Sequence, residues 1–230
     1  MDKKTKISII ICFCLIGVLL VFNIFIGAYV LSNNTEKIFD NNILKVVEIK
    51  ASDDEENWGY ATGCFVDSNG TLLTNKHVVF NSNTSTNYSH IYVRTATSEE
   101  YSKAEVLRVS ETDDLALIKV NLTNTSHFEI AHNVKNGQTI YTIGNPNGFG
   151  LSFTQGVVSS GSRNVIYNEK TINAIQTSFV INEGNSGGPV FNKHGQLMGI
   201  ISFRLKDKNG SVIQGCSFAI PYSTINSFVN

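Results

Sequence analysis

The sequence has no excess of charge of either sign. Its 18 lysine and arginine residues face 19 aspartate and glutamate residues, which gives a formal net charge of −1 over 230 residues. A nucleic-acid-binding domain needs a basic patch or stripe, because much of its affinity comes from neutralising phosphates. The composition gives no sign of such a surface, so we expect no nucleic-acid partner.

Cysteine is also scarce, with four residues in the chain. Cys12 and Cys14 lie in an apolar run near the N-terminus, whereas Cys64 and Cys216 lie far apart in the remainder. We expect Cys64 and Cys216 to be small buried side chains. A disulfide between them is the alternative, which an exported protein would allow. No cluster of cysteine or histidine has the spacing of metal ligands, so we expect no metal and no cofactor.

Long helical periodicity is missing after residue 42, apart from a possible short terminal turn after Pro221. Short apolar segments alternate there with turn residues such as Asp67–Gly70. The segments of the first half are 43–49, 59–66, 71–74, 90–96, 104–109 and 115–120. Those of the second half are 139–143, 150–160, 171–177, 189–191, 197–203 and 214–220. This spacing is typical of all-β folds. We expect two antiparallel six-stranded barrels, at about residues 43–121 and 138–222.

One stretch of the chain is both long and free of charge. Ile7–Leu31 has no charged residue over 25 positions, and three lysines lie within the six residues before it. A helix of that length extends about 37 Å, enough to cross about 30 Å of hydrocarbon with some tilt. Positive residues stay on the cytoplasmic side of a membrane. We therefore expect residues 1–6 to be cytoplasmic and the domain after the helix to be extracytoplasmic.

The expected arrangement is that of a single-pass protein of the cell membrane. It has an anchor at residues 7–31, a polar linker at 32–42 and one domain at 43–230. A cleaved signal peptide is the alternative. The apolar run is long for a signal peptide and no small-residue cleavage site follows it, which favours a retained anchor.

The most informative motif of the domain is a serine between glycines. Residues 183–190 read Glu-Gly-Asn-Ser-Gly-Gly-Pro-Val, with Ser186 as the serine. Glycine lets the backbone turn sharply and approach a substrate closely. Such a turn can aim the amides of Gly184 and Ser186 at one point, where a developing oxyanion would lie. An ordinary tight turn is the alternative for this motif taken alone.

Two upstream motifs favour the catalytic interpretation. The run from Leu72 to Val79 looks like a strand that ends at a histidine, His77, and Asp113–Asp114 precede another apolar run. The order histidine, aspartate, serine is one of the known orders of a serine hydrolase triad. Counted through Asp114, the gaps are 37 and 72 residues. Ser186 would be the nucleophile and His77 the base that takes its proton.

Further segments extend this pattern along the domain. They are Thr62–Val66, Asp114–Val120, Ile143–Pro146, Gly156–Ser159, Ile175–Thr177, Gly199–Ile200 and Phe218–Pro221. With the runs around His77 and Ser186, they resemble the trypsin-like serine proteases of the HtrA/Deg type. The resemblance covers roughly residues 45–228 and implies a chymotrypsin-like fold with the active site between the barrels.

The resemblance also assigns roles to single residues. The family's aspartate directly precedes the Leu-Ala-Leu strand, which selects Asp114 and makes Asp113 a turn residue. Ser202 occupies a position where the family has a hydroxyl near that aspartate, and a half-buried strand serine is the alternative. HtrA proteases often trimerise, so a homotrimer is a possible assembly. They commonly carry PDZ domains as well, and only nine residues follow Pro221 here, so we expect no PDZ domain.

A substrate pocket is expected beside the serine turn. Val180 and Ile181 before the turn, and Ser202 and Arg204 after it, would line this pocket. It has aliphatic walls and no acidic residue, so a buried lysine or arginine of the substrate would lack a partner. We therefore expect cleavage after small or medium apolar residues. Arg204 could instead bind an acidic residue, and Lys76 beside His77 is reminiscent of glutamyl endopeptidases.

Taken together, the sequence predicts a membrane-anchored, extracytoplasmic serine endopeptidase acting on polypeptides. Its substrates would be misfolded proteins or specific exported proteins, and the sequence leaves both open. A non-proteolytic chaperone-like or peptide-binding module on the same fold is the alternative from a different class. Family members often have proline where Glu183 stands, so the serine turn of this chain departs from the family at that position.

Overall fold

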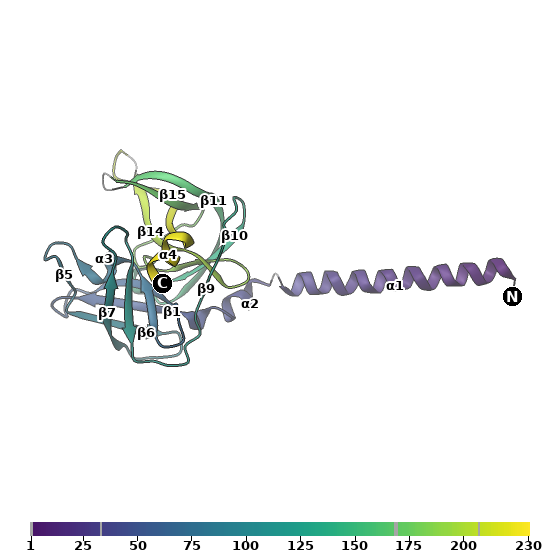
Figure 1. The fold of residues 1–230 in the computed structure, drawn as a ribbon, viewed down its shortest axis with the longest axis horizontal. Coiled ribbons are helices and arrows are strands. Elements are labelled where there is room, and N and C mark those ends of the chain that lie inside the picture. Colours follow the sequence, from purple (N-terminus) through teal and green to yellow (C-terminus); the bar gives the residue numbers. More distant parts are fainter. Residues whose placement is uncertain (1, 33, 168–169, 207) are drawn as a thin grey trace. The chain divides into compact units, whose positions relative to one another are not determined.

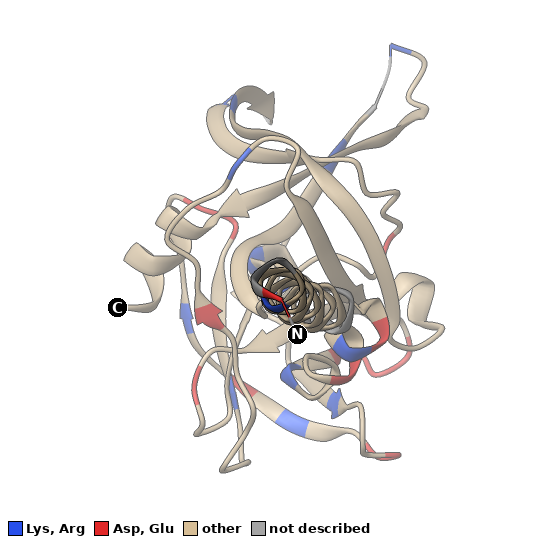
Figure 2. Ribbon diagram, turned by 90° about the vertical axis from the view of Figure 1, so that its right-hand side faces the viewer, with Lys and Arg blue, Asp and Glu red and all other residues tan. Residues whose placement is uncertain are grey.

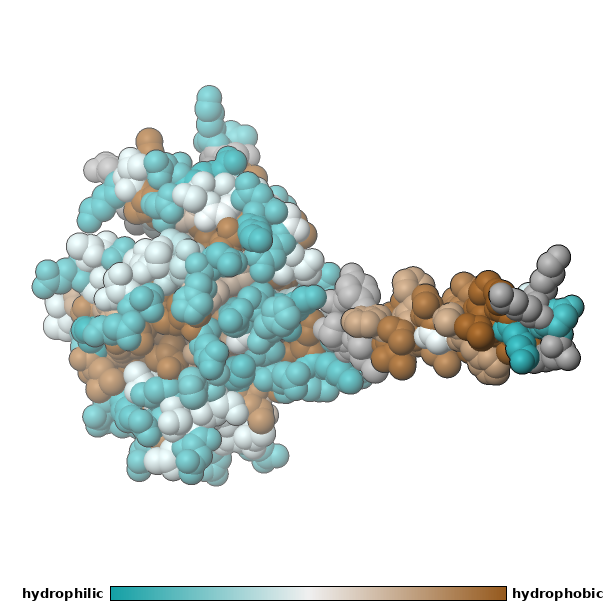
Figure 3. All heavy atoms as spheres, turned by 45° about the vertical axis from the view of Figure 1, so that its right-hand side comes forward, coloured by the Kyte–Doolittle hydropathy of each residue, from teal (hydrophilic) through white to brown (hydrophobic). Residues whose placement is uncertain are grey.

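The computed structural model describes residues 2–32, 34–167, 170–206 and 208–230 (Figure 1). The chain divides into two compact units, Met1–Ile38 and Phe39–Asn230. The first unit is dominated by α1 (Lys3–Ser32), a single long helix. Its segment Thr5–Gly27, 23 residues long, is the one helix of the described residues with the length and apolarity to cross a membrane. Figure 3 shows the continuous apolar surface of this helix. A signal sequence would have the same properties.

Six strands of the second unit form a closed barrel. They are β1 (Val46–Ser52), β2 (Gly59–Phe65), β3 (Thr71–Thr74), β6 (His90–Thr95), β7 (Ser102–Val109) and β8 (Ala116–Val120). Their order around the barrel is β1-β2-β3-β8-β7-β6, and all neighbours are antiparallel. Alternate apolar residues, among them Val47, Ile49 and Ile118, point inward and fill the core. The prediction of a six-stranded first barrel is confirmed.

The second half of the domain folds into a seven-stranded sheet. Its strands are β9 (Glu129–Ile130), β10 (Thr139–Gly144), β11 (Ser152–Tyr167), β12 (Lys170–Thr177), β13 (Pro189–Phe191), β14 (Gln196–Lys206) and β15 (Val212–Pro221). The order is β13-β10-β11-β12-β15-β14-β9, and β13 also pairs with β14. That extra pairing returns the sheet on itself, so the six predicted strands form a ring around a second core that includes Ile140, Phe179 and Met198.

Several elements were not expected from the sequence. The polar linker at 32–42 contains the helix α2 (Thr35–Asp40), and β9 lies in the segment expected only to separate the barrels. Short elements also appear at η1 (Ile43–Lys45), α3 (Lys76–Val79), β4 (Phe80–Asn81), β5 (Thr86–Asn87) and η2 (Pro146–Gly148), whereas α4 (Tyr222–Val229) lies where a short turn was expected after Pro221. The unexpected helices of three to six residues and strands of two residues are too short to show a clear apolar period.

The two cysteines of the domain are both free. Cys64 is completely buried on β2, and burial raises the pKa of its thiol far above the ordinary range. Cys216 on β15 is only half-buried and accepts a hydrogen bond from Gln176 Nε2 at 3.3 Å. The expectation of a small buried side chain therefore holds for Cys64, whereas Cys216 is partly exposed.

Charged residues are spread over the domain. In Figure 2, the positions of lysine and arginine and those of aspartate and glutamate are scattered along the ribbon, without a long run of one sign among the described residues. This distribution agrees with the nearly neutral composition.

Candidate active site

The strand pairing of the first barrel brings His77 and Asp114 together. β3 pairs with β8 so that Thr74 lies opposite Ala116. His77 follows β3 by three residues, on the short helix α3, and Asp114 precedes β8 by two. An antiparallel pair places the end of one strand beside the start of the other. Two residues that are 37 positions apart in the sequence therefore meet at one end of the barrel.

The contact between these two side chains has the geometry of a catalytic dyad. His77 Nδ1 lies 2.8 Å from Asp114 Oδ2 and 3.0 Å from Oδ1, and the His77 backbone amide donates to Oδ1 at 3.0 Å. An ionised carboxylate can only accept hydrogen bonds, so Nδ1 carries the proton. In the neutral imidazole, Nε2 then carries no proton and can act as a base. The side chains are 51% and 31% exposed, so Nε2 remains reachable for a substrate.

Asp114 is held by two further residues. Ser202 Oγ, on β14, donates to Asp114 Oδ2 at 2.6 Å, and Asn75 Nδ2 donates to the Asp114 backbone carbonyl at 2.9 Å. Ser202 therefore contacts the aspartate, as the resemblance implied. Asp113 lies in the preceding turn, where its amide donates to Ser110 Oγ at 3.0 Å and its carboxylate accepts from Thr112.

The turn that carries Ser186 is attached to both barrels. The amide of Thr62 on β2 donates to the Ser186 carbonyl at 2.9 Å, and the Gly187 amide donates to the Ile201 carbonyl of β14 at 2.9 Å. Ser202, which contacts Asp114, directly follows Ile201. These hydrogen bonds bring the serine turn close to the histidine and aspartate, although its residues lie 70 or more positions later in the chain.

Two glycines of the turn have backbone angles that other residues rarely adopt. Gly184 has φ 91° and Gly187 has φ 82°. A Cβ at Gly184 would collide with the Asn145 carbonyl oxygen, and one at Gly187 with Thr62 and Thr74. Glycine is therefore required at both positions. Within the described residues, neither the Gly184 nor the Ser186 amide donates a hydrogen bond. Both predicted oxyanion donors are thus available to a ligand.

The structure does not connect all three predicted residues. Among the described residues, Ser186 Oγ makes no hydrogen bond, so it is not joined to His77 Nε2. Without a bound substrate, catalytic hydrogen bonds are often long or poorly aligned. The dyad is therefore assembled, whereas the bond from serine to histidine is not formed.

The predicted pocket residues have different surroundings. Val180 is 57% exposed, but Ile181 is buried in the core of the second barrel. Arg204 lies on β14, and its Nη1 donates to the Ile181 carbonyl at 3.0 Å. Its Nη2 lies 3.8 Å from an oxygen of the exposed Glu183. The contact of the guanidinium with Ile181 is to its backbone carbonyl. Arg204 therefore already has two partners, the Ile181 carbonyl and the Glu183 carboxylate.

The electrostatic surroundings of Asp114 extend to the hairpin of β11 and β12. Burial and, to a smaller extent, the negative charge of Asp114 raise the pKa of Tyr167. The ring of Tyr167 stacks on Phe203, with 4.1 Å between centroids, and Phe203 stacks on Phe218. An aromatic stack therefore lies within electrostatic reach of the site.

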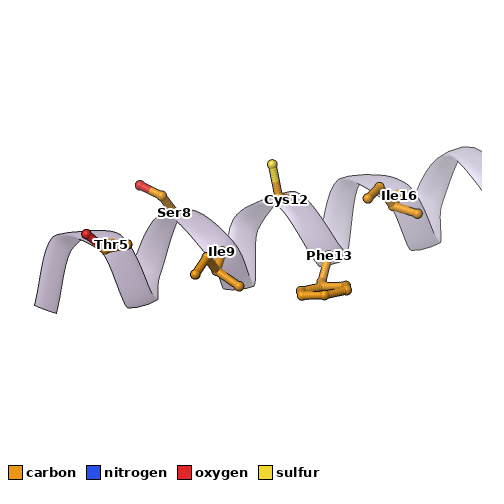
Figure 4. Close-up of a pocket in the computed structure, with 6 residues that line it drawn as sticks. All are labelled: Thr5, Ser8, Ile9, Cys12, Phe13 and Ile16. Carbon is orange, nitrogen blue, oxygen red and sulfur yellow. The ribbon is translucent and has the colours of Figure 1, made fainter. Parts of the chain in front are cut away.

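Other features of the described residues do not form a second site. They contain no group of three or more histidine, cysteine or acidic residues arranged to hold a metal ion. The shallow groove in Figure 4 lies along one side of α1 alone, between side chains such as Ser8, Cys12 and Phe13. It follows from the surface of an apolar helix, and its lining includes no charged residue.

Sequence reasoning missed two supporting residues, Asn75 and Thr62. Both are buried, and both lie within motifs that were recognised. Their partners are 39 and 122 positions away, so no local pattern could reveal the contacts.

Comparison with known proteins places the chain in a family. A family model for the trypsin-like peptidase domain matches residues 61–200, which is more than half of the chain and includes His77, Asp114 and Ser186. The chain belongs to this family. It is also similar to serine proteases of the HtrA/DegP type.

Among the curated relatives, a probable periplasmic serine endoprotease DegP-like of Pseudomonas fulva is 36% identical over 164 residues, which is 70% of this chain and 32% of the relative. The serine protease Do-like HtrA of Lactobacillus helveticus is 32% identical over 170 residues, 70% of this chain and 39% of the relative. This peptidase thus spans about a third of the length of such relatives.

Solved structures agree with the fold. The HtrA-type protease AlgW with tripeptide matches with a TM-score of 0.72 and 26% identity, over 84% of this peptidase and 61% of AlgW. The prediction of a chymotrypsin-like, all-β domain is confirmed.

Proposed function

We propose that this chain is a membrane-anchored, extracytoplasmic serine endopeptidase that hydrolyses peptide bonds through His77, Asp114 and Ser186. The observation that carries the proposal is the contact between His77 Nδ1 and Asp114 Oδ2 at 2.8 Å. It leaves Nε2 as a base in a domain of the trypsin-like peptidase family. A serine hydroxyl is inert at neutral pH unless such a base takes its proton.

In the proposed reaction, Ser186 Oγ attacks the carbonyl carbon of the scissile bond while His77 Nε2 takes the hydroxyl proton. Asp114 keeps the imidazole oriented and stabilises the imidazolium that forms. The imidazolium then gives its proton to the leaving amine, and an acyl-enzyme remains on Ser186. Water, activated by His77 in the same way, releases the acid. Ser202 supports Asp114 by donating to Oδ2 at 2.6 Å.

The amides of Gly184 and Ser186 would stabilise the oxyanion of each tetrahedral intermediate. Two observations support this role: the turn is fixed at both ends by backbone hydrogen bonds, and these two amides have no partner among the described residues. Donors that are already oriented need no rearrangement as charge develops on the substrate oxygen. Removing one such donor costs a factor of about 10² to 10³ in kcat in related chemistry.

For the substrate, we propose a small or medium apolar residue before the scissile bond. Glu183, the acidic residue in this region, is 88% exposed and paired with Arg204, so it is poorly placed to neutralise a buried lysine or arginine. Burying that charge without a partner costs several kcal/mol. An aliphatic side chain that is removed from water gains about 1.5–3 kcal/mol. An acidic preference would instead point to Arg204.

The N-terminal helix supports membrane anchoring. Its apolar segment is long enough to span, and Lys3, Lys4 and Lys6 favour a cytoplasmic N-terminus. The domain would then act outside the cytoplasm, where the relatives named periplasmic also act. Its substrates would be misfolded or specific exported polypeptides.

The proposal is tested with the full-length chain in detergent micelles and a peptide library read by mass spectrometry. Cleavage is expected after apolar residues, and Ser186→Ala should abolish it. Ser223→Ala is the matched control, because Ser223 is an exposed serine on α4. Undiminished cleavage by Ser186→Ala would contradict the assigned nucleophile. If the unaltered chain binds peptides but does not cleave them, the result would favour the chaperone-like alternative.

A further inference from the structure

Thr62 makes an unusual number of contacts with the turn that carries Ser186. It lies on β2 in the first barrel and is completely buried. Its hydroxyl donates to the Gly184 carbonyl at 2.7 Å, and its backbone amide donates to the Ser186 carbonyl at 2.9 Å. Its carbonyl accepts from Thr74 Oγ1 at 2.8 Å. One residue of the first barrel therefore holds two carbonyls of a turn that belongs to the second.

The same hydroxyl also holds a second segment. Thr62 Oγ1 accepts a hydrogen bond from the Asn145 amide at 2.9 Å. The segment that begins at Asn145 includes Asn147, whose amide donates to the Glu183 carbonyl at 2.7 Å. A hydroxyl has one proton to donate and lone pairs to accept, so both bonds can exist together. Thr62 thus contacts the serine turn directly and, through Asn145, also holds the segment that binds Glu183.

These contacts determine where the oxyanion donor points. The Glu183 carbonyl and the Gly184 N–H belong to the same planar peptide group, in which they point in opposite directions. Because Asn147 holds the carbonyl, the N–H points to the other side. Holding the Gly184 carbonyl in turn fixes the next peptide group. The Thr62 hydroxyl thus holds the second group directly and acts on the first through Asn145, two residues before the Asn147 that binds the Glu183 carbonyl.

We propose that Thr62 is a positioning residue for catalysis, whose hydroxyl fixes the oxyanion turn at Gly184–Ser186. This inference rests on the proposed function. It adds that the first barrel, besides carrying His77 and Asp114, fixes the oxyanion site of the second barrel. Thr62 is completely buried, so it would act through the Gly184 carbonyl and the Asn145 amide rather than on the substrate itself.

The chain contains a matched control for this proposal. Thr142 on β10 is also a buried threonine, but its hydroxyl has no hydrogen-bond partner among the described residues. Thr62→Val and Thr142→Val make the same chemical change at buried strand positions. Thr142→Val reports the effect of the threonine-to-valine change itself at a buried strand position, whereas an effect seen only at Thr62 comes from the hydrogen bonds of its hydroxyl. Thr62→Ser keeps the hydroxyl and should restore function.

The first measurement is steady-state hydrolysis of a peptide by the full-length chain in detergent. Thr62→Val should lower kcat at least about tenfold with KM within twofold, because a misaligned oxyanion donor weakens only the transition state. Thr62→Ser and Thr142→Val should stay within threefold of the unaltered chain. An unchanged kcat in Thr62→Val, or an equal loss in Thr142→Val, would overturn the proposal.

The second measurement is amide hydrogen exchange of the peptide that covers residues 183–188. Thr62→Val should raise its exchange rate at least about tenfold, and Thr142→Val should not. Hydrogen exchange needs no enzymatic activity, so it tests the positioning contact even in an inactive chain. Inactivity of the unaltered chain would refute only the proposed function. If Thr62→Val does not fold, Thr62→Ala removes the same hydroxyl with the same expected outcomes. Equal exchange in the hydroxyl-free variant and the unaltered chain overturns the proposal.

Discussion

Replacement of Glu48 by glutamine should destabilise the domain more than any replacement of a surface acid. Glu48 is almost fully buried on β1, and its Oε2 accepts from Arg94 Nη2 at 2.8 Å and from Tyr101 OH at 3.1 Å. It also accepts from Asn145 Nδ2 at 3.3 Å. The carboxylate therefore joins β6 and the start of β7 to the segment beside the serine turn.

The magnitude follows from these contacts. A hydrogen bond to a charged group contributes about 1.5–3 kcal/mol and a neutral one about 0.5–1.5 kcal/mol. Glu48→Gln keeps the shape but removes the charge, so the two shorter bonds lose about 1 kcal/mol each. The loss at Arg94 stays at this modest level because its side chain is 31% exposed and solvent screens its charge. We expect the free energy of unfolding to fall by about 2 kcal/mol.

The assay is thermal unfolding of the full-length chain, followed by the fluorescence of its single tryptophan, Trp58. Trp58 packs edge-on against Tyr92 in the same barrel, with 5.8 Å between the ring centroids. For a domain of this size, about 2 kcal/mol lowers Tm by about 4–8 °C.

The control variant is Glu55→Gln, which removes an exposed partner of His90 and should lower Tm by less than about 2 °C. Equal shifts in Glu48→Gln and Glu55→Gln would refute the argument that the buried carboxylate connects the segments.

Three further predictions concern single features. Cys64 should resist iodoacetamide at pH 8 in the folded chain and react after unfolding in urea, because burial raises the pKa of its thiol. Peptide mapping measures the labelling, and rapid labelling of Cys64 in the folded chain would contradict this prediction. Ser202→Ala should lower kcat/KM for peptide hydrolysis about tenfold, because it removes a hydrogen bond to the Asp114 carboxylate worth about 1.5 kcal/mol. An unchanged kcat/KM would show that this hydrogen bond is dispensable. Protease added to intact cells should digest the domain while Ile7–Leu31 stays in the membrane fraction, and a soluble product beginning near residues 28–35 would instead indicate a cleaved signal.

The sequence predicted the barrels because their strands carry a local signal. Alternating apolar residues and turn-rich breaks reflect burial on one face of each strand, and this pattern is visible within five to eight residues. The same reasoning failed for α2, where Ile38 is the one buried residue of a six-residue helix. It also failed for β9, a two-residue strand that pairs with β14 through contacts distant in the sequence.

For the candidate site, the residue types and their order were predictable, whereas the supporting contacts were not. The glycines at Gly184 and Gly187 have left-handed backbone angles, which their presence beside Ser186 suggested. The hydrogen bonds that Thr62 and Asn75 make depend on how the two barrels and the strand ends meet. They span 122 and 39 positions and leave no local pattern.

The most direct test of the account is the reaction of the full-length chain with a fluorophosphonate, which labels a serine only where a neighbouring base activates it. Intact mass and peptide mapping then locate the adduct. The account predicts one adduct, on Ser186, that is lost in His77→Ala while that variant keeps its fold. Labelling that persists in Ser186→Ala, or no labelling of the unaltered chain, would contradict the claim that His77 activates Ser186.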